Sequence, residues 1–176
     1  MSLECIEVRD AVPSRIKDLY HHSFPLYERR PWPQQVLLVE EKKLQLLELV
    51  LDNRFAGFIF FWPLSAFIFI EHFAIDHTRR GSGIGTQAMQ HVAAVSGTVI
   101  LETEPEDQGM HAQRRIRFYE KLGYKKFPFP YQQPPYLPGY PAPNMYLMHN
   151  GQPTGAADFE KVKNEIYTTV YGIDKG

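Results

Sequence analysis

The chain has 176 residues, of which 44% are hydrophobic and 22% are charged, as is ordinary for one folded domain. Its formal net charge of -1 argues against general electrostatic binding of nucleic acid. The one cysteine excludes an internal disulfide, and the histidines lack metal-ligand spacing, so we expect no metal site. Because the sequence has neither a long apolar run nor an apolar signal core, we expect a cytoplasmic protein without membrane partners.

The first half of the chain predicts helices followed by an antiparallel meander. In chain order, the expected elements are a strand at 5–8, a helix at 15–23, a short helix from Pro33, and strands at 43–51, 55–62 and 66–75. The pair Asp52-Asn53 is typical of a tight hairpin turn. Because short turns join consecutive strands here, neighbouring strands should run antiparallel.

The second half predicts alternating helices and strands. The expected elements are a helix at 83–96, a strand at 99–101, a helix at 113–122, a strand at 144–148 and a helix at 158–171. Gly97 and Gly123 should end the first two helices, and the first helix with its flanking strands indicates a parallel βαβ unit. Residues 128–143 contain seven prolines and three tyrosines, which favours a packed, functional loop over a disordered linker.

A glycine-rich turn precedes the helix at 83–96. Its residues are Arg80, Gly81, Ser82, Gly83, Ile84, Gly85 and Thr86. Free backbone N–H groups and the positive end of the helix dipole bind anions, so the turn predicts a phosphate site. A Walker P-loop is excluded, because Gly85-Thr86 lacks the required lysine. A dinucleotide-binding turn is disfavoured, because Thr86 replaces the third small residue and an antiparallel meander precedes the turn.

A third interpretation rests on a resemblance to the GNAT superfamily of N-acetyltransferases. The spacing Arg80-x-x-Gly83-x-Gly85 is similar to its pyrophosphate-binding signature. Residues 117–124 (RFYEKLGY) are similar to its second acetyl-CoA helix, and residues 70–76 resemble the strand that binds the pantetheine arm. Together, in this order, these motifs indicate an acyl-CoA site.

The resemblance covers roughly residues 3–149 and implies an α/β fold of the GNAT acyl-CoA N-acyltransferase type. Such a fold has a central mixed, mostly antiparallel sheet with splayed parallel strands and flanking helices. Residues 1–149 would form the acetyltransferase domain, and residues 150–176 its C-terminal helical extension. Residues 27–32 and 133–136 also resemble a bacterial subgroup whose substrates are largely unassigned.

The implied function is direct transfer of an acetyl group from acetyl-CoA to a primary amine of a small molecule or amino acid. The alternative is a catalytically weak acyl-CoA-binding or sensing domain. No metal cofactor is implied, and a homodimer is left open. The cofactor-binding residues that the resemblance implies are Phe73, Ala74, Ile75, Arg80, Gly81, Ser82, Gly83, Ile84, Gly85, Thr86 and Phe118.

Two residues are predicted to move protons. The family places the phenol that corresponds to Tyr119 beside the CoA sulfur, so Tyr119 is expected to protonate the departing thiolate. Glu71 is the first candidate for the base, because it interrupts the apolar alternation of its strand. In a hydrophobic cleft, its pKa would rise toward values useful at neutral pH.

Other polar residues are candidates for binding the acceptor. Glu102 and Glu104, at the end of an apolar strand, could bind a cationic acceptor or relay a proton through water. Arg29 and Arg30 would favour an acceptor that carries a carboxylate, unless they are simply solvated. The loop that contains Tyr136 could line the acceptor site or mediate dimer packing. His72 is expected to be a packed or capped histidine.

Overall fold

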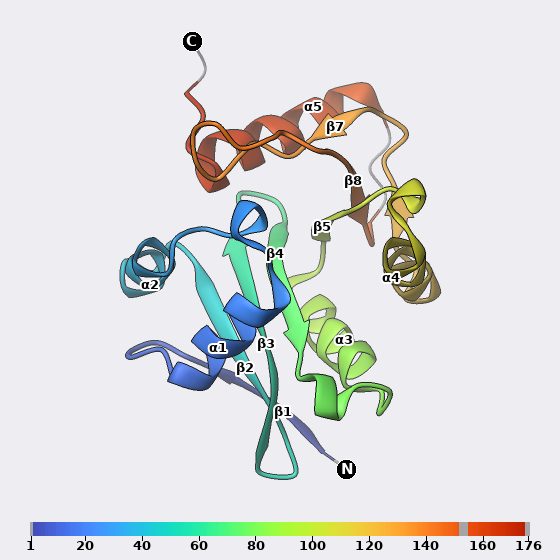
Figure 1. Cartoon of the computed structure of the whole chain (residues 1–176). Helices are drawn as coiled ribbons and strands as arrows, with labels where there is room; N and C mark the ends of the chain where they lie inside the picture. The colour runs from blue at the N-terminus through green and yellow to red at the C-terminus, as the bar shows by residue number, and fades with distance from the viewer. Residues whose placement is uncertain (1, 152–154, 175–176) are drawn as a thin grey trace. The chain divides into compact units, whose positions relative to one another are not determined.

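Figure 1 shows the computed structural model of the chain, which describes residues 2–151 and 155–174. The described chain divides into two compact units, residues 1–97 and 98–176.

The unit of residues 1–97 is built on an antiparallel sheet in the order β1-β2-β3-β4. Its strands are β1 (Leu3–Glu7), β2 (Gln45–Leu51), β3 (Arg54–Pro63) and β4 (Ile68–Ile75). Its helices are α1 (Ser14–Ser23), α2 (Trp32–Glu40) and α3 (Ile84–Ser96), with short 3-10 turns η1 (Leu26–Glu28) and η2 (His77–Arg79). The predicted meander of β2, β3 and β4 is therefore confirmed.

The hairpin of β2 and β3 shows how local residues set the sheet. Asp52 and Asn53 have φ values of 50° and 60°, the left-handed conformation that a tight hairpin turn requires. At Gly57, with φ of 159°, an added Cβ would lie 2.3 Å from the carbonyl oxygen of Ala74 on β4. Only glycine allows β3 and β4 to approach this closely at that point.

Helix α1 packs on β3 and β4 through one apolar face. Ile16, Leu19 and Tyr20 follow the i, i+3, i+4 spacing of such a face, and all are buried. The Tyr20 ring lies 5.8 Å from that of Phe60 and 6.3 Å from that of Phe58, both fully buried on β3. Burying each large side chain of this kind contributes about 1.5–3 kcal/mol, so the aromatic contacts anchor α1 to the sheet.

The unit of residues 98–176 is organised around β8 (Asn144–His149), which runs antiparallel to β5 (Val99–Thr103), β6 (Lys125–Lys126) and β7 (Tyr131–Gln132). Its helices are α4 (Met110–Lys121) and α5 (Ala156–Glu165), with a 3-10 turn η3 (Glu106–Gln108). The stretch predicted as a loop thus contributes β7 to the sheet.

The C-terminal helix differs from the prediction at its end. A helix was expected over 158–171; it is α-helical over Ala156–Glu165 and continues as a π-helical turn over Ile166–Val170 (η4). A π-helical turn is wider than an α-helical turn, so it changes the direction in which the side chains after it leave the helix. Tyr171 directly follows this turn.

Candidate active site

The glycine turn lies between β4 and α3, as predicted. Gly81 and Gly83 have φ values of 82° and 75°, which favour glycine. Gly83 caps α3, so the N–H groups of Ile84, Gly85 and Thr86 have no acceptor within the helix. An added Cβ at Gly81 or Gly83 would meet nothing within 4 Å, and residues 81–83 are exposed. These open amides at a helix N-terminus fit a diphosphate.

Strand β4 leads into this turn. Phe73, Ala74 and Ile75, which the resemblance assigns to the pantetheine arm, are its last residues and pair with β3. Arg80 Nε donates to the carbonyl oxygen of Ile75 at 3.4 Å, so the exposed arginine is held at the strand end beside the turn. Ser82 Oγ donates to the carbonyl oxygen of Arg79, the last residue of η2, at 2.7 Å, which leaves the Ser82 N–H as the group best suited to bind an anion.

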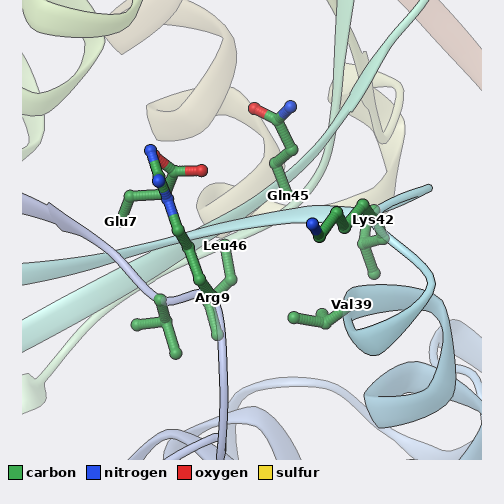
Figure 2. Close-up of a pocket in the computed structure, with 8 residues that line it drawn as sticks. Glu7, Arg9, Val39, Lys42, Gln45 and Leu46 are labelled. Atoms are coloured by element: carbon green, nitrogen blue, oxygen red, sulfur yellow. The ribbon is translucent and has the colours of Figure 1, made fainter.

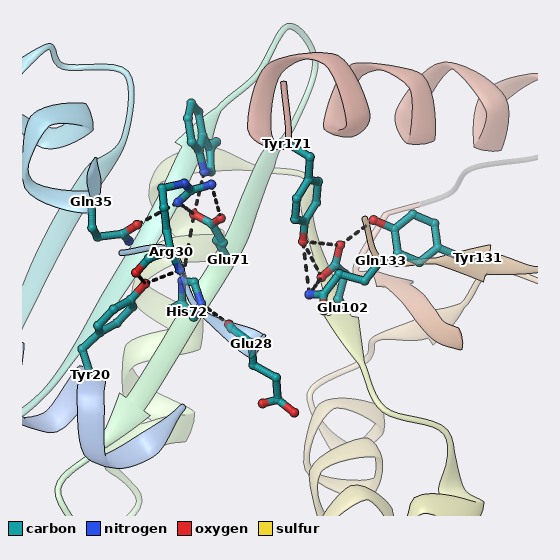
Figure 3. Close-up of polar contacts among 11 residues, drawn as sticks. Tyr20, Glu28, Arg30, Gln35, Glu71, His72, Glu102, Tyr131, Gln133 and Tyr171 are labelled. Atoms are coloured by element: carbon teal, nitrogen blue, oxygen red, sulfur yellow. Dashed lines mark hydrogen bonds and ion pairs between the residues drawn. The ribbon is translucent and has the colours of Figure 1, made fainter. Parts of the chain in front are cut away.

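Glu71, in the middle of β4, has a side chain that is 0% exposed and lies in a polar cluster (Figure 3). Arg30 donates from Nη2 to Oε1 at 2.7 Å and from Nη1 to Oε2 at 3.1 Å. Trp62 Nε1 donates to Oε2 at 2.9 Å. Arg30 itself is held by Gln35 Oε1 at 2.7 Å and, through its backbone N–H, by the Tyr20 hydroxyl at 3.0 Å. This cluster fastens the segment before α2 to β4.

The predicted rise in the pKa of Glu71 is wrong. Burial by itself raises this pKa, but the charges of Arg30 and His72 and the hydrogen bonds from Arg30 and Trp62 outweigh burial and hold it below its ordinary value. A carboxylate in this state is a poor base at neutral pH. Arg30 was expected, with Arg29, to meet an acceptor carboxylate or solvent; it is instead buried and paired with Glu71, 41 residues later in the chain, and no local pattern marks this pairing.

Neighbouring basic residues have structural contacts. The buried His72 has Nε2 2.9 Å from the carbonyl oxygen of Glu28, and burial lowers its pKa, so the expected packed histidine is confirmed. Arg29 Nη1 donates to the carbonyl oxygens of His21 and Phe24, at the C-terminal end of α1. Arg29 thereby caps α1, and its contact with a substrate carboxylate stays a prediction.

Glu102, on β5, lies in a second polar cluster (Figure 3). The Tyr131 hydroxyl donates to Oε1 at 2.5 Å, and Gln133 Nε2 donates to Oε2 at 2.6 Å. The Tyr171 hydroxyl lies 2.9 Å from both carboxylate oxygens and donates a bifurcated hydrogen bond to them. The rings of Tyr171 and Tyr136 are 5.4 Å apart. The structure thus brings the proline-tyrosine loop to Glu102, and it adds residues that the sequence did not indicate.

Glu104 lies beside α4, and Tyr119 is a residue of that helix. Glu104 Oε2 lies 4.0 Å from Arg115 Nη1, so its side chain is directed toward that helix. Tyr119 is buried, and its ring lies 5.1 Å from that of Phe118 and 5.7 Å from that of Tyr124. Burial raises the pKa of Tyr119 to about 12, slightly offset by the charge of Arg115. The phenol therefore keeps its proton at neutral pH, as a proton donor must.

A pocket of about 170 Å³ in the unit of residues 1–97 contains none of the predicted site residues. Figure 2 shows Arg9 and Lys42 on opposite sides of it. It is lined by Glu7, Val8, Arg9, Val39, Lys42, Leu44, Gln45 and Leu46. Within residues 2–151 and 155–174, there is no group of His, Cys, Asp and Glu side chains that could hold a metal ion. No helix in this described part is both long and apolar enough to cross a membrane.

Comparisons with known proteins agree with this geometry. The family model of the acetyltransferase (GNAT) domain matches residues 34–126, just over half of the chain. A protein of Bacteroides thetaiotaomicron assigned to the GNAT acetyltransferases has a similar structure, with a TM-score of 0.86 and 29% identity over 92% of each chain. A comparison with curated proteins found no match.

More distant structures show the same fold. Naa50 of Arabidopsis thaliana, solved with the bisubstrate analogue CoA-Ac-MVNAL, has a TM-score of 0.61 and 17% identity over 86% of this chain and 99% of its own. A GNAT acetyltransferase of Elizabethkingia anophelis, solved with acetyl-CoA bound, has a TM-score of 0.54 and 16% identity over 84% of this chain and 95% of its own. The expected α/β fold is confirmed, and the chain belongs to the GNAT family of acetyltransferases.

Proposed function

We propose that the protein transfers an acetyl group from acetyl-CoA to a primary amine of a small molecule or an amino acid. The observation that carries the proposal is the open glycine turn, because free amides at a helix N-terminus are suited to a diphosphate. Membership in the acetyltransferase family and the similarity to an acetyl-CoA-bound structure support the same donor.

The glycine turn and the end of β4 would hold the donor. The N–H groups of Gly81, Ser82, Gly83, Ile84, Gly85 and Thr86 bind the diphosphate, and Arg80 contributes positive charge beside them. Phe73, Ala74 and Ile75 line the pantetheine arm, and a backbone N–H among them polarises the thioester carbonyl. Acetyl-CoA would supply that carbonyl and a thiolate leaving group. Phe118 contributes an aromatic wall beside Tyr119.

The two proton transfers are assigned to Glu102 in the second polar cluster and to Tyr119 on α4. An amine with a pKa near 10.4 is protonated at neutral pH and must lose a proton before its nitrogen can attack. Glu102 takes that proton, directly or through water, and Tyr119 gives its hydroxyl proton to the departing thiolate. Glu71 is instead assigned a positioning role, because the charge of Arg30 holds its carboxylate in the ionised form, whereas Tyr131, Gln133 and Tyr171 are neutral donors to Glu102.

The remaining candidates bind the acceptor. Tyr136 is favoured, because its ring packs on Tyr171 beside Glu102. Glu104 and Arg29 are kept as weaker candidates, because their side chains already contact Arg115 and the end of α1.

The test is release of free thiol from acetyl-CoA in the presence of a panel of amines. We expect release that depends on the amine, and a loss of about a hundredfold in kcat for Tyr119→Phe with CoA binding nearly unchanged. Tyr124→Phe is the matched control, because it removes a neighbouring buried hydroxyl to which no role is assigned.

Unchanged turnover in Tyr119→Phe would remove Tyr119 from the mechanism. Equal losses in both variants would indicate disturbed packing rather than a lost proton donor. Tight CoA binding with no thiol release for any amine would indicate an acyl-CoA-binding or sensing domain in place of an enzyme.

A further inference from the structure

Side-chain oxygen atoms converge at Glu102. The hydroxyl of Tyr131 lies 2.5 Å from Oε1, and the hydroxyl of Tyr171 lies 2.9 Å from both carboxylate oxygens. Burial, and then the charge of Glu102, raises the pKa of Tyr131. The Tyr131 hydroxyl therefore stays protonated and donates a hydrogen bond to the carboxylate. Glu102, Gln133 and Tyr171 are only half-buried, so the cluster reaches the solvent-exposed surface.

The donors already present determine which cation fits. Oε1 accepts from Tyr131 and Tyr171, and Oε2 accepts from Gln133 and Tyr171. A guanidinium needs both carboxylate oxygens for two parallel hydrogen bonds, and these donors compete for the same positions. An ammonium group has N–H donors that spread apart, and it can bind one carboxylate oxygen together with phenol oxygens.

The orientation of the tyrosines excludes another class of cation. Figure 3 shows the hydroxyls of Tyr131 and Tyr171 pointing at Glu102. Quaternary ammonium groups bind over the faces of aromatic rings. Here oxygen atoms rather than ring faces meet the carboxylate, which favours a cation that can donate hydrogen bonds.

The C-terminal segment supplies one of the four residues of this cluster, Tyr171. The π-helical turn Ile166–Val170 precedes Tyr171, and within it the Tyr167 hydroxyl donates to the carbonyl oxygen of Gln132 at 2.5 Å. Gln133 Nε2 also donates to the Tyr171 hydroxyl at 3.2 Å. The segment therefore holds both the carboxylate and the chain that carries Gln133. π-helical turns occur frequently at functional sites.

We infer that Glu102, Tyr131, Gln133 and Tyr171 form a binding site for a primary ammonium group, and that Tyr171 makes the site select ammonium over guanidinium. The identification of this ammonium with the acceptor amine rests on the proposed function; binding of the cation does not. The π-helical turn and Tyr171 are then a part of the acceptor site rather than an appendage to the domain.

Binding is tested without acetyl-CoA. The side-chain amide signal of Gln133, identified by its absence in Gln133→Met, is followed by NMR while n-butylammonium or n-butylguanidinium chloride is added. We expect saturable shifts with butylammonium and at least tenfold weaker binding of butylguanidinium. Glu102→Gln should abolish binding, and Tyr171→Phe should weaken ammonium binding about tenfold and remove most of the selectivity.

Tyr167→Phe is the matched control, because it removes a hydroxyl of the same segment that contacts Gln132 instead of Glu102. It should keep the selectivity of the unchanged protein. Equal binding of the two cations, no shift with either, or unchanged selectivity in Tyr171→Phe would overturn the inference. Should Tyr171→Phe fail to fold, Tyr131→Phe provides the same test from the other side of the carboxylate.

The acyl-transfer assay separates the two proposals. Tyr171→Phe should raise KM for amine acceptors about tenfold with kcat nearly unchanged, the pattern of lost ground-state binding. Butylammonium binding without thiol release from any amine would refute the proposed enzyme and leave the ammonium site standing. Thiol release together with an unaffected KM in Tyr171→Phe would refute the ammonium site alone.

Discussion

Replacing Arg30 by methionine should strongly destabilise the protein at neutral pH. The side chains of Arg30 and Glu71 are 8% and 0% exposed, and they meet at 2.7 and 3.1 Å. A hydrogen bond to a charged group contributes about 1.5–3 kcal/mol, so losing the two hydrogen bonds from Arg30 to Glu71 lowers the free energy of unfolding by roughly 3–6 kcal/mol. That range agrees with the ~3–5 kcal/mol expected when one partner of a buried ion pair is removed.

The loss should shrink as the pH falls. In the unchanged protein the pKa of Glu71 is lowered from its ordinary value of 4.5. The ionised carboxylate therefore stabilises the fold fully above pH 4.5, and this stabilisation is lost only as the pH falls through the lowered pKa. Without Arg30, burial becomes the dominant effect and raises the pKa of Glu71 above that of the unfolded chain. The folded variant then takes up a proton that the unfolded chain does not, so the variant gains relative stability between pH 7 and 5.

Urea denaturation followed by circular dichroism at pH 7 and pH 5 measures both effects. The double variant Arg30→Met/Glu71→Gln should recover much of the loss, because no charge remains buried at this position. Arg9→Met is the matched control: Arg9 pairs with Glu7, the two side chains are 74% and 44% exposed, and an exposed pair contributes only about 0–1 kcal/mol. A loss below 1 kcal/mol for Arg30→Met, or a gap that widens toward pH 5, would refute the reasoning.

Further predictions concern buried groups in each unit. Tyr124→Phe should leave the free energy of unfolding unchanged or raise it by about 1 kcal/mol, because the Tyr124 hydroxyl is buried without a partner among the described residues; a clear loss in urea denaturation would contradict this. Gly57→Ala should destabilise the protein by roughly 3 kcal/mol or more, because its Cβ would collide with the backbone of Ala74. Gly155→Ala should be tolerated, because its Cβ would meet nothing within 4 Å. Equal melting temperatures of the two variants would contradict this prediction. Stability should fall as the pH drops below 6.5, because burial lowers the pKa of His72, and the unfolded chain then binds a proton that the folded chain does not bind. His72→Gln should reduce the slope of stability against pH. An unchanged slope would contradict the assignment to His72.

Features that depend on neighbouring residues could be read from the sequence. Asp52-Asn53 predicted the hairpin turn, and Gly81 with Gly83 predicted an open turn before α3, because positive φ values are a local property of the chain. The periodicity of Ile16, Leu19 and Tyr20 likewise predicted α1. Motif order within such elements was sufficient to predict the family, and the comparisons confirmed it. The role of Tyr119 as proton donor stays a prediction.

Features that depend on distant partners were decided by the tertiary structure alone. The sequence predicted Glu71 as a base, but Arg30, 41 residues away, pairs with it and lowers its pKa. Glu102 was predicted to be functional, yet its contact with Tyr171, 69 residues away, follows from a π-helical turn that no local pattern indicated. The sequence thus determined the backbone that fits an acyl-CoA diphosphate. The folded chain determined that the carboxylate of Glu71 is held in its charged form, because charge state depends on the groups that packing brings within hydrogen-bonding distance.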